Sequence, residues 1–250
     1  MDRFYKWKHS KAIFGEMGRI VQGKSTWTWS ETWRSYKNRK HSDPFSNLTK
    51  IAEMNSLAGL QSVFYIMTTE ENHPLNINDY KVDELKGMLL DLISAGAEIG
   101  IHPGIQTFND EQKMASQKEA LESVIGQSVK RSRQHYLKYE YPETFRKLES
   151  VGIENDSSIL VDLSSVENAQ MRSTYKMFED SNSRITQTPL VFMDTHHMQE
   201  SDEAILKKLE DSISPAKKNG GEVMILWHNN NISNNREIGL YKEALEVISN

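Results

Sequence analysis

The sequence predicts an α/β fold in which strands and helices alternate along the chain and the strands form a parallel sheet. Apolar, β-branched runs that are short enough for buried strands alternate with segments of about ten to fifteen residues that have helical spacing. The length of 250 residues suits one large domain, and no short internal repeat or low-complexity segment divides it. An open doubly wound sheet and a closed barrel both fit this pattern.

The first half of the chain opens with a basic, aromatic segment, residues 1–45, that contains TWTWSETW and ends at the turn signal Ser42-Asp43-Pro44. We expect it to form helices and loop packed over the sheet. Asp110 is placed to cap a helix that runs to Ile125, with Gly126 at its end. Apolar spacing predicts two further helices, over 45–57 and 82–95, and two strands, over 61–67 (QSVFYIM) and 97–101 (AEIGI).

The second half repeats this alternation. A short strand is expected just before Arg133, and a helix from Pro142 to Val151 ends at Gly152. The run EVMILW (222–227) is a strong strand signal because it is short and every residue after Glu222 is apolar. The remaining predicted elements are strands over 153–155 and 190–193 and helices over 201–214 and 238–249.

Composition excludes several classes of protein. The sequence has no cysteine, so a metal would be held by His, Asp or Glu, and disulfide scaffolds and iron–sulfur clusters are excluded. The net charge of -5 argues against nucleic acid as a partner. No apolar run approaches the ~18–20 residues of a membrane span, and the N-terminus lacks the apolar core of a secretory signal. We therefore expect no transmembrane segment and a cytoplasmic protein.

The charge is uneven, because residues 1–40 hold ten Lys or Arg against three Asp or Glu. That excess of positive charge is typical of a basic helix exposed to solvent. The alternative is that this segment faces an anionic partner.

Four polar residues stand at the ends of four predicted strands. They are His102, His135, Asp156 and His228. The carboxyl ends of parallel strands lie at the same edge of the sheet, and α/β proteins have their binding and active sites at that edge. The four residues are therefore expected to meet.

This set of residues suits metal-assisted hydrolysis. Two neutral imidazoles and a carboxylate can hold a divalent cation, which polarises a carbonyl and lowers the pKa of bound water. A further histidine that does not bind the metal can protonate the leaving group. Arg133 beside a carboxylate would orient that carboxylate and keep it ionised.

Five short motifs occur in a fixed order: EIGIHP (98–103), SRQHYL (132–137), GIENDSS (152–158), PLVFMD (189–194) and ILWHN (225–229). With DPF (43–45) ahead of them, the series resembles the NodB-like polysaccharide deacetylase superfamily, more closely its bacterial branch associated with surface-polysaccharide biosynthesis. The resemblance covers essentially the whole chain, 1–250, as a single domain. It implies a distorted parallel barrel of the (β/α)7 type, a divalent metal with Zn²⁺ favoured, and removal of an N- or O-acetyl group from an amino sugar or surface polysaccharide.

The resemblance also implies a role for each residue of the site. His102 and His135 would bind the metal with Asp2, and His228 would be the general acid, tuned by Asp156 and supported by Arg133. Contacts with the carbohydrate would come from Tyr136, Arg172, Trp227 and Asn229.

The chain departs from the family pattern at its beginning. The family starts with a strand that ends in an Asp-x-Asp motif, whereas Met1-Asp2-Arg3-Phe4-Tyr5 resembles the residues just after that motif. The first strand is thus missing or altered, and the carboxylate that acts as general base is absent. The alternative function is therefore a catalytically inactive relative that binds carbohydrate or serves in assembly.

Other candidate residues have a plainer explanation. Trp27, Trp29 and Trp33 could stack on sugar rings, but we expect them to anchor the N-terminal segment. His196 and His197 are adjacent on an extended chain and point opposite ways, so they cannot chelate one ion together. We expect them near the surface, and Asp194 receives little weight as a site residue.

Overall fold

The main sheet of the computed structural model contains six strands in the order β1-β2-β3-β4-β6-β5. The structure describes residues 3–9, 11–39, 42–69, 73–76, 78–165 and 171–250. A second sheet pairs β7 with β8. The strands are β1 (Val63–Ile66), β2 (Glu98–Ile101), β3 (Arg131–Ser132), β4 (Asn155–Asp156), β5 (Tyr175–Lys176), β6 (Thr186–Gln187), β7 (Leu190–Met193) and β8 (Met224–Leu226).

Nearly every strand pairing is parallel, as the sequence predicts. β1 and β2 run side by side over four residue pairs, from Val63 with Glu98 to Ile66 with Ile101. A parallel bridge between Leu160 and Leu190 joins the chain after β4 to β7, and so connects the two sheets. Among the strands in the described ranges, only β5 is antiparallel to its neighbour, β6.

The sheets do not close into the barrel that the resemblance implies. Among the described strands, β8 pairs with β7 alone and β1 with β2 alone, so β8 and β1 are not joined. The result is an α/β fold with a mostly parallel, open arrangement of strands. The part of the prediction that concerns strand and helix alternation is confirmed, whereas closure is not seen.

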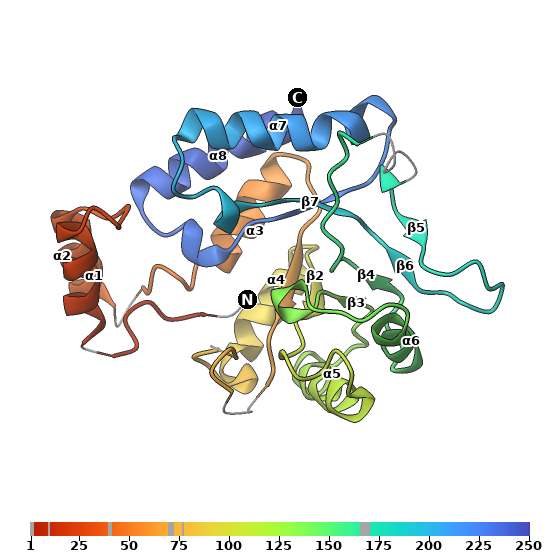
Figure 1. The fold of residues 1–250 in the computed structure, drawn as a ribbon. Helices are drawn as coiled ribbons and strands as arrows, with labels where there is room; N and C mark the ends of the chain where they lie inside the picture. The colour runs from red at the N-terminus through yellow and green to blue at the C-terminus, as the bar shows by residue number, and fades with distance from the viewer. Residues whose placement is uncertain (1–2, 10, 40–41, 70–72, 77, 166–170) are drawn as a thin grey trace.

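Helices cover both sides of this arrangement (Figure 1). α7 and α8 lie together beside β7, and α5 and α6 lie on the opposite side of the molecule. α1 and α2 form a pair that stands apart from the sheets. The helices are α1 (Ala12–Val21), α2 (Trp29–Asn38), α3 (Leu48–Leu57), α4 (Lys86–Ser94), α5 (Glu111–Ile125), α6 (Glu143–Ser150), α7 (Asp202–Lys218) and α8 (Asn235–Ser249).

Local capping explains where α5 begins and ends. The Asp110 side chain accepts a hydrogen bond from Lys113 N, and Gly126 takes a left-handed conformation with φ 73° just after the last turn. Both ends were predicted from these residues. α7 runs further than expected, because it continues past Pro215 to Lys218. No helix in the described ranges is both long and apolar enough to cross a membrane.

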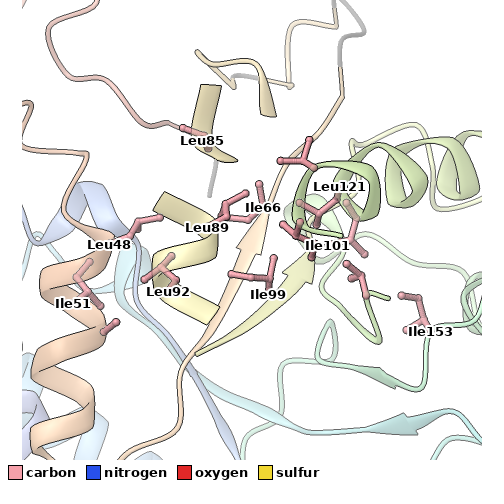
Figure 2. Packing of buried hydrophobic residues seen from close by; sticks show 14 of the residues in the cluster. Leu48, Ile51, Ile66, Leu85, Leu89, Leu92, Ile99, Ile101, Leu121 and Ile153 are labelled. Atoms are coloured by element: carbon pink, nitrogen blue, oxygen red, sulfur yellow. The ribbon is translucent and has the colours of Figure 1, made fainter. Parts of the chain in front are cut away.

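The core lies between the strands and α3, α4 and α5 (Figure 2). Ile66 and Ile99 of β1 and β2 lie toward Leu89 and Leu92 of α4, and Ile101 lies beside Leu121 of α5. Each of these side chains is less than a tenth exposed. A second cluster packs α7 and α8 against β7, with Phe192, Ile205 and Leu209 at its centre. Burial of these side chains is the main contribution that holds the helices on the sheets.

The N-terminal segment has a small core of its own, in which Trp7, Ile13 and Trp27 are buried together. Trp27 is thus an anchor, as expected, while Trp29 and Trp33 are about half exposed, at 51% and 50%. The Asp43 carboxylate ties the segment to the start of α3, accepting hydrogen bonds from Lys6 N (2.7 Å) and Trp7 N (2.9 Å).

Candidate functional site

Two histidines meet at the carboxyl ends of β2 and β3. His102 follows β2 directly, and His135 lies in a 3-10 turn, His135–Leu137, just after β3. His102 Nε2 and His135 Nδ1 are 3.0 Å apart, and the two rings stand edge to face with their centroids 5.0 Å apart. The prediction that these strand ends bring the two histidines together agrees with this geometry.

The second nitrogen of each ring is held by a backbone carbonyl. His102 Nδ1 lies 2.6 Å from Arg133 O, and His135 Nε2 lies 2.7 Å from Leu75 O. A carbonyl oxygen only accepts, so each of these nitrogens carries the hydrogen, and the nitrogens that face each other are both acceptors in neutral rings. Two lone pairs at this separation repel unless a proton or a cation lies between them. Metal-binding histidines commonly have this second-nitrogen support.

A strained turn aims His135 inward. Tyr136 and Leu137 both have positive φ, 56° and 53°, which non-glycine residues rarely adopt. His135 is 3% exposed as a result, while Tyr136 is 59% exposed and its ring lies 4.4 Å from the His135 ring. Tyr136, which was predicted to contact substrate, is therefore accessible beside the histidine pair.

His228 forms a separate arrangement with Asp194. Its Nδ1 lies 2.6 Å from Asp194 Oδ1, and its backbone N–H donates to Asp194 Oδ2 at 2.9 Å. Asp194 is fully buried and also accepts from Asn231 Nδ2 at 2.8 Å. This fixes the imidazole with Nδ1 toward the carboxylate, so that Nε2 is the nitrogen that can exchange a proton with a substrate.

Asp194 takes the place that the sequence had assigned to Asp156. The Asp156 side chain accepts hydrogen bonds from Ser132, from Ser158 N (2.7 Å) and from Ser158 Oγ (3.0 Å). Burial raises the pKa of Asp156, and these hydrogen bonds and Arg133 oppose that rise. The sequence signal for Asp194 is its place directly after the apolar run LVFM, at a predicted strand end. In the structure Met193 pairs with Leu226, which places Asp194 next to the end of β8.

Arg133 follows β3, and its carbonyl oxygen is the one that holds His102 Nδ1. Its side chain is 3% exposed, its Nε donates to Ser157 Oγ at 3.0 Å, and its guanidinium carbon lies 4.5 Å from the Tyr65 ring centre. Nη2 is buried and has no hydrogen-bond partner within the part of the chain that the structure describes. Burial lowers the pKa of Arg133, although Tyr65 and Asp156 oppose that change.

Two residues that were predicted to contact substrate, Asn229 and Trp227, make contacts within the protein. Asn229 is 7% exposed, and its amide donates to Arg3 O (2.9 Å) and Phe45 O (2.8 Å), so this donor group is already used. Trp227 packs against Tyr241 at 5.2 Å and Phe192 at 6.0 Å and donates to Asn231 O. Both residues flank His228 in the sequence, and both side chains are held by neighbours in the protein.

Arg172 lies near the start of β8, at the opposite end of this strand from His228. Its carbonyl packs on Gly221, where an added Cβ would lie only 1.8 Å from Arg172 O. Gly221 precedes β8, whereas His228 follows it, and the strand rise of about 3.3 Å per residue separates the two ends. The substrate contact expected of Arg172 is therefore not supported by its position. Asp2, the third predicted metal ligand, lies outside the described residues.

Two hollows are present near these strands. The larger, about 1170 Å³, is lined by polar residues that include Thr69, Asn76 and Lys113, and none of the candidate site residues lines it. The smaller, about 300 Å³, lies between β1 and β8, and its lining includes Arg133, Trp227, His228 and Asn229. Of these two hollows, the smaller is the one that candidate site residues line.

Comparisons with known proteins give a likeness in fold. A crystal structure of a Mycobacterium smegmatis protein assigned as a polysaccharide deacetylase aligns with 96% of this chain and 80% of its own, with a TM-score of 0.60 and 12% sequence identity. The chain therefore shares its overall fold with that structure. At 12% sequence identity this likeness shows a shared architecture only. The reaction has to be inferred from the residues of the site.

A second structure, IcaB from Ammonifex degensii, aligns with 64% of this chain and 82% of its own, at 9% identity and a TM-score of 0.35. No protein-family model and no curated protein matches the chain.

Proposed function

We propose that this protein is a metal-dependent deacetylase that removes an N- or O-acetyl group from an amino sugar or a surface polysaccharide. The observation that carries the proposal is the histidine pair, in which His102 Nε2 and His135 Nδ1 face each other at 3.0 Å while both other ring nitrogens bind backbone carbonyls. A divalent cation between them would relieve the repulsion of the two lone pairs. The deacetylase fold supports this choice of reaction and of a carbohydrate substrate.

His102 and His135 would hold the metal, and Zn²⁺ suits their imidazole nitrogens. Within the described ranges no group of three or more His, Asp or Glu side chains is placed to hold a metal. The proposed third protein ligand is Asp2. When bound, the metal would polarise the acyl carbonyl of the substrate and lower the pKa of a water molecule.

The protein's own groups would do the remaining work. His228, oriented by Asp194, would donate the proton from Nε2 to the departing nitrogen or oxygen of the sugar. Asp194 would hold the imidazole in one tautomer and stabilise its protonated form. The exposed ring of Tyr136 beside His135 would contact the sugar.

The experiment combines metal content with turnover. The full chain and its His102→Ala and His228→Ala variants are exposed to zinc, desalted and analysed for metal, and acetate release from N-acetylated oligosaccharides is measured. We expect about one zinc per chain, lost in His102→Ala and kept in His228→Ala, and turnover lost in both. His196→Ala, an exposed histidine, is the control and should keep both properties. Full zinc occupancy in His102→Ala would exclude the ligand assignment.

The alternative function is a carbohydrate-binding or assembly protein without turnover. The observation that favours it is the lack of a three-residue metal group among the described side chains. Binding of an acetylated oligosaccharide by the zinc-loaded chain with no acetate release would support this alternative and exclude the enzyme.

A further inference from the structure

The exposed side of α2 carries two tryptophans. Trp29 and Trp33 are each about half exposed, and the core of the N-terminal segment is built around Trp27 instead. Residues four apart lie on the same face of a helix, so the two indoles are neighbours on the surface of α2. The expectation that tryptophans anchor the segment therefore holds for Trp27, and the other two are open to a ligand.

A cation continues this row toward the C-terminal end of α2. Lys37 follows Trp33 by a further four residues, and its Nζ lies 5.4 Å from the centre of the Trp33 ring. From Trp29 to Lys37 the row spans about 12 Å of helix, at a rise of 1.5 Å per residue. We call these three residues, Trp29, Trp33 and Lys37, the α2 face.

The surroundings of the α2 face are positively charged. Residues 3–9 and 11–39 hold nine Lys or Arg against two Glu. Of these two carboxylates, Glu16 is buried and pairs with Lys6 at 3.0 Å, and Glu31 accepts from Thr28 N at 3.0 Å in the capping box of α2. Such a surface attracts an anion and repels a second copy of itself.

The N-terminal end of α2 is docked where the loop that begins at His228 meets α8. Asn234 Nδ2 donates to Thr26 Oγ1 at 2.8 Å. Asn235 N donates to Glu31 Oε1 at 3.4 Å. His228 and Asn234 are six residues apart, so at most about 20 Å of chain separates them. A polymer several units long can therefore have one unit beside His228 and another on the α2 face.

The chemistry of the α2 face fits a negatively charged polysaccharide. The flat apolar face of an indole packs against the C–H face of a sugar ring, and a lysine beside it pairs with a carboxylate of the same chain. A lipid bilayer takes up a broader apolar face than this one, which is interrupted by the exposed polar residues Ser30 and Arg34. The exposed apolar residues that suit a bilayer, Phe14 and Val21, lie on α1 instead.

We propose that the α2 face binds a negatively charged polysaccharide, so that the substrate is an anionic polymer with one acetylated unit beside His228. The inference rests on the proposed deacetylase function for the reacting unit, whereas the binding surface stands without it. Trp29 and Trp33 hold sugar rings, and Lys37 selects a chain that bears carboxylates over a neutral one. All three are binding residues and take no part in the reaction.

The test compares two hexasaccharides. A hyaluronan hexasaccharide alternates acetylated amino sugars with carboxylate sugars, and a chitin hexasaccharide contains acetylated amino sugars only. Both are titrated by calorimetry into the full chain with a chelator present, so that binding is measured without turnover. The variants are Trp33→Ala and Lys37→Gln, and Trp29→Ala repeats the test if Trp33→Ala does not fold. The matched controls are Phe14→Ala, an exposed aromatic residue of α1, and Lys50→Gln, an exposed lysine of α3.

We expect the chain to bind hyaluronan about tenfold more tightly than chitin at low salt, and to lose this preference as salt screens the charges. Trp33→Ala should weaken the binding of both hexasaccharides by about tenfold, because both chains stack on the indole. Lys37→Gln should weaken the binding of hyaluronan alone. Both controls should bind as the unmodified chain does.

Equal affinities for the two hexasaccharides would overturn the proposal, as would hyaluronan binding that Trp33→Ala and Lys37→Gln leave unchanged. Vesicles of phosphatidylglycerol provide a further comparison. If the chain binds these vesicles and neither hexasaccharide, and Phe14→Ala abolishes that binding, the segment is a membrane contact and the proposal is wrong.

The outcome can be separated from that of the deacetylase assay. Acetate release from chitin oligosaccharides by the zinc-loaded chain, without a preference for hyaluronan, would overturn this inference and leave the proposed reaction intact. Preferential binding of hyaluronan that depends on Trp33 and Lys37, without acetate release from either substrate, would support the binding surface and count against the reaction.

Discussion

Asp194 holds His228 from two sides, with Oδ1 2.6 Å from the imidazole Nδ1 and Oδ2 2.9 Å from the backbone nitrogen of the same residue. Asp194→Asn keeps the size of the side chain but removes the charge that orients and supports the protonated imidazole. We expect acetate release to fall by about 10²-fold with zinc content unchanged. Steady-state kinetics and metal analysis on the same preparation would check this.

Two variants make that measurement decisive. Asp211→Asn changes an exposed carboxylate that pairs with Lys207 and should leave the rate unaffected. Asp156→Asn tests the assignment made from sequence. Loss of turnover in Asp156→Asn together with normal turnover in Asp194→Asn would contradict the arrangement that the structure gives to His228.

Two glycines should respond in opposite ways to the same change. Gly126 has φ 73° and Gly87 lies inside α4 with no positive φ, and neither has an atom within 4 Å of an added Cβ. Gly126→Ala should lower the free energy of unfolding by about 1 kcal/mol through backbone strain. Gly87→Ala should raise it by about 0.5–1 kcal/mol, because alanine favours the helix. Urea unfolding of both variants measures the two changes in the free energy of unfolding. Changes of the same sign would contradict the backbone conformations that the structure gives to these glycines.

Lys6 should make stability depend on alkaline pH. It lies over the Trp27 ring at 4.4 Å and pairs with Glu16 at 3.0 Å, and burial lowers its pKa although Glu16 opposes that change. Between the lowered pKa and the ordinary lysine value, the unfolded chain binds more protons than the folded chain. The contribution of Lys6 to the free energy of unfolding therefore rises with pH in this window.

The difference between wild type and Lys6→Met isolates this contribution. Urea unfolding at about pH 8 and about pH 10 should show a larger rise for the wild type than for Lys6→Met. Lys50→Met, at an exposed position of α3, should rise as the wild type does. An identical pH dependence in all three chains would show that Lys6 keeps an ordinary pKa.

The sequence predicted best those features that depend on neighbouring residues. The ends of α5 follow from Asp110 and Gly126, which act within one turn of the helix. β7 was predicted with its observed bounds because LVFM is a continuous apolar run bounded by Pro189 and Asp194. The meeting of His102 and His135 followed from the general rule that parallel strands present their ends together.

Features set by contacts distant in sequence were not predictable in the same way. The pairing of Asp194 with His228 requires β7 to lie beside β8, and the Leu75 carbonyl that holds His135 has no sequence signal at all. β4 is two residues long, shifted from the predicted 153–155, because its pairing with β3 and β6 decides its extent. Closure of the sheets likewise depends on a pairing that apolar periodicity does not encode.

The hydrogen bond from Asn229 to Arg3 spans 226 residues of chain. During synthesis at about 5–20 residues per second, Arg3 emerges roughly 10–45 s before its partner exists. For that interval the N-terminal segment has to persist without the contact that fixes it beside His228. The residues of its own small core, Trp7, Ile13 and Trp27, are close in sequence, so forming their contacts with one another does not require the later chain.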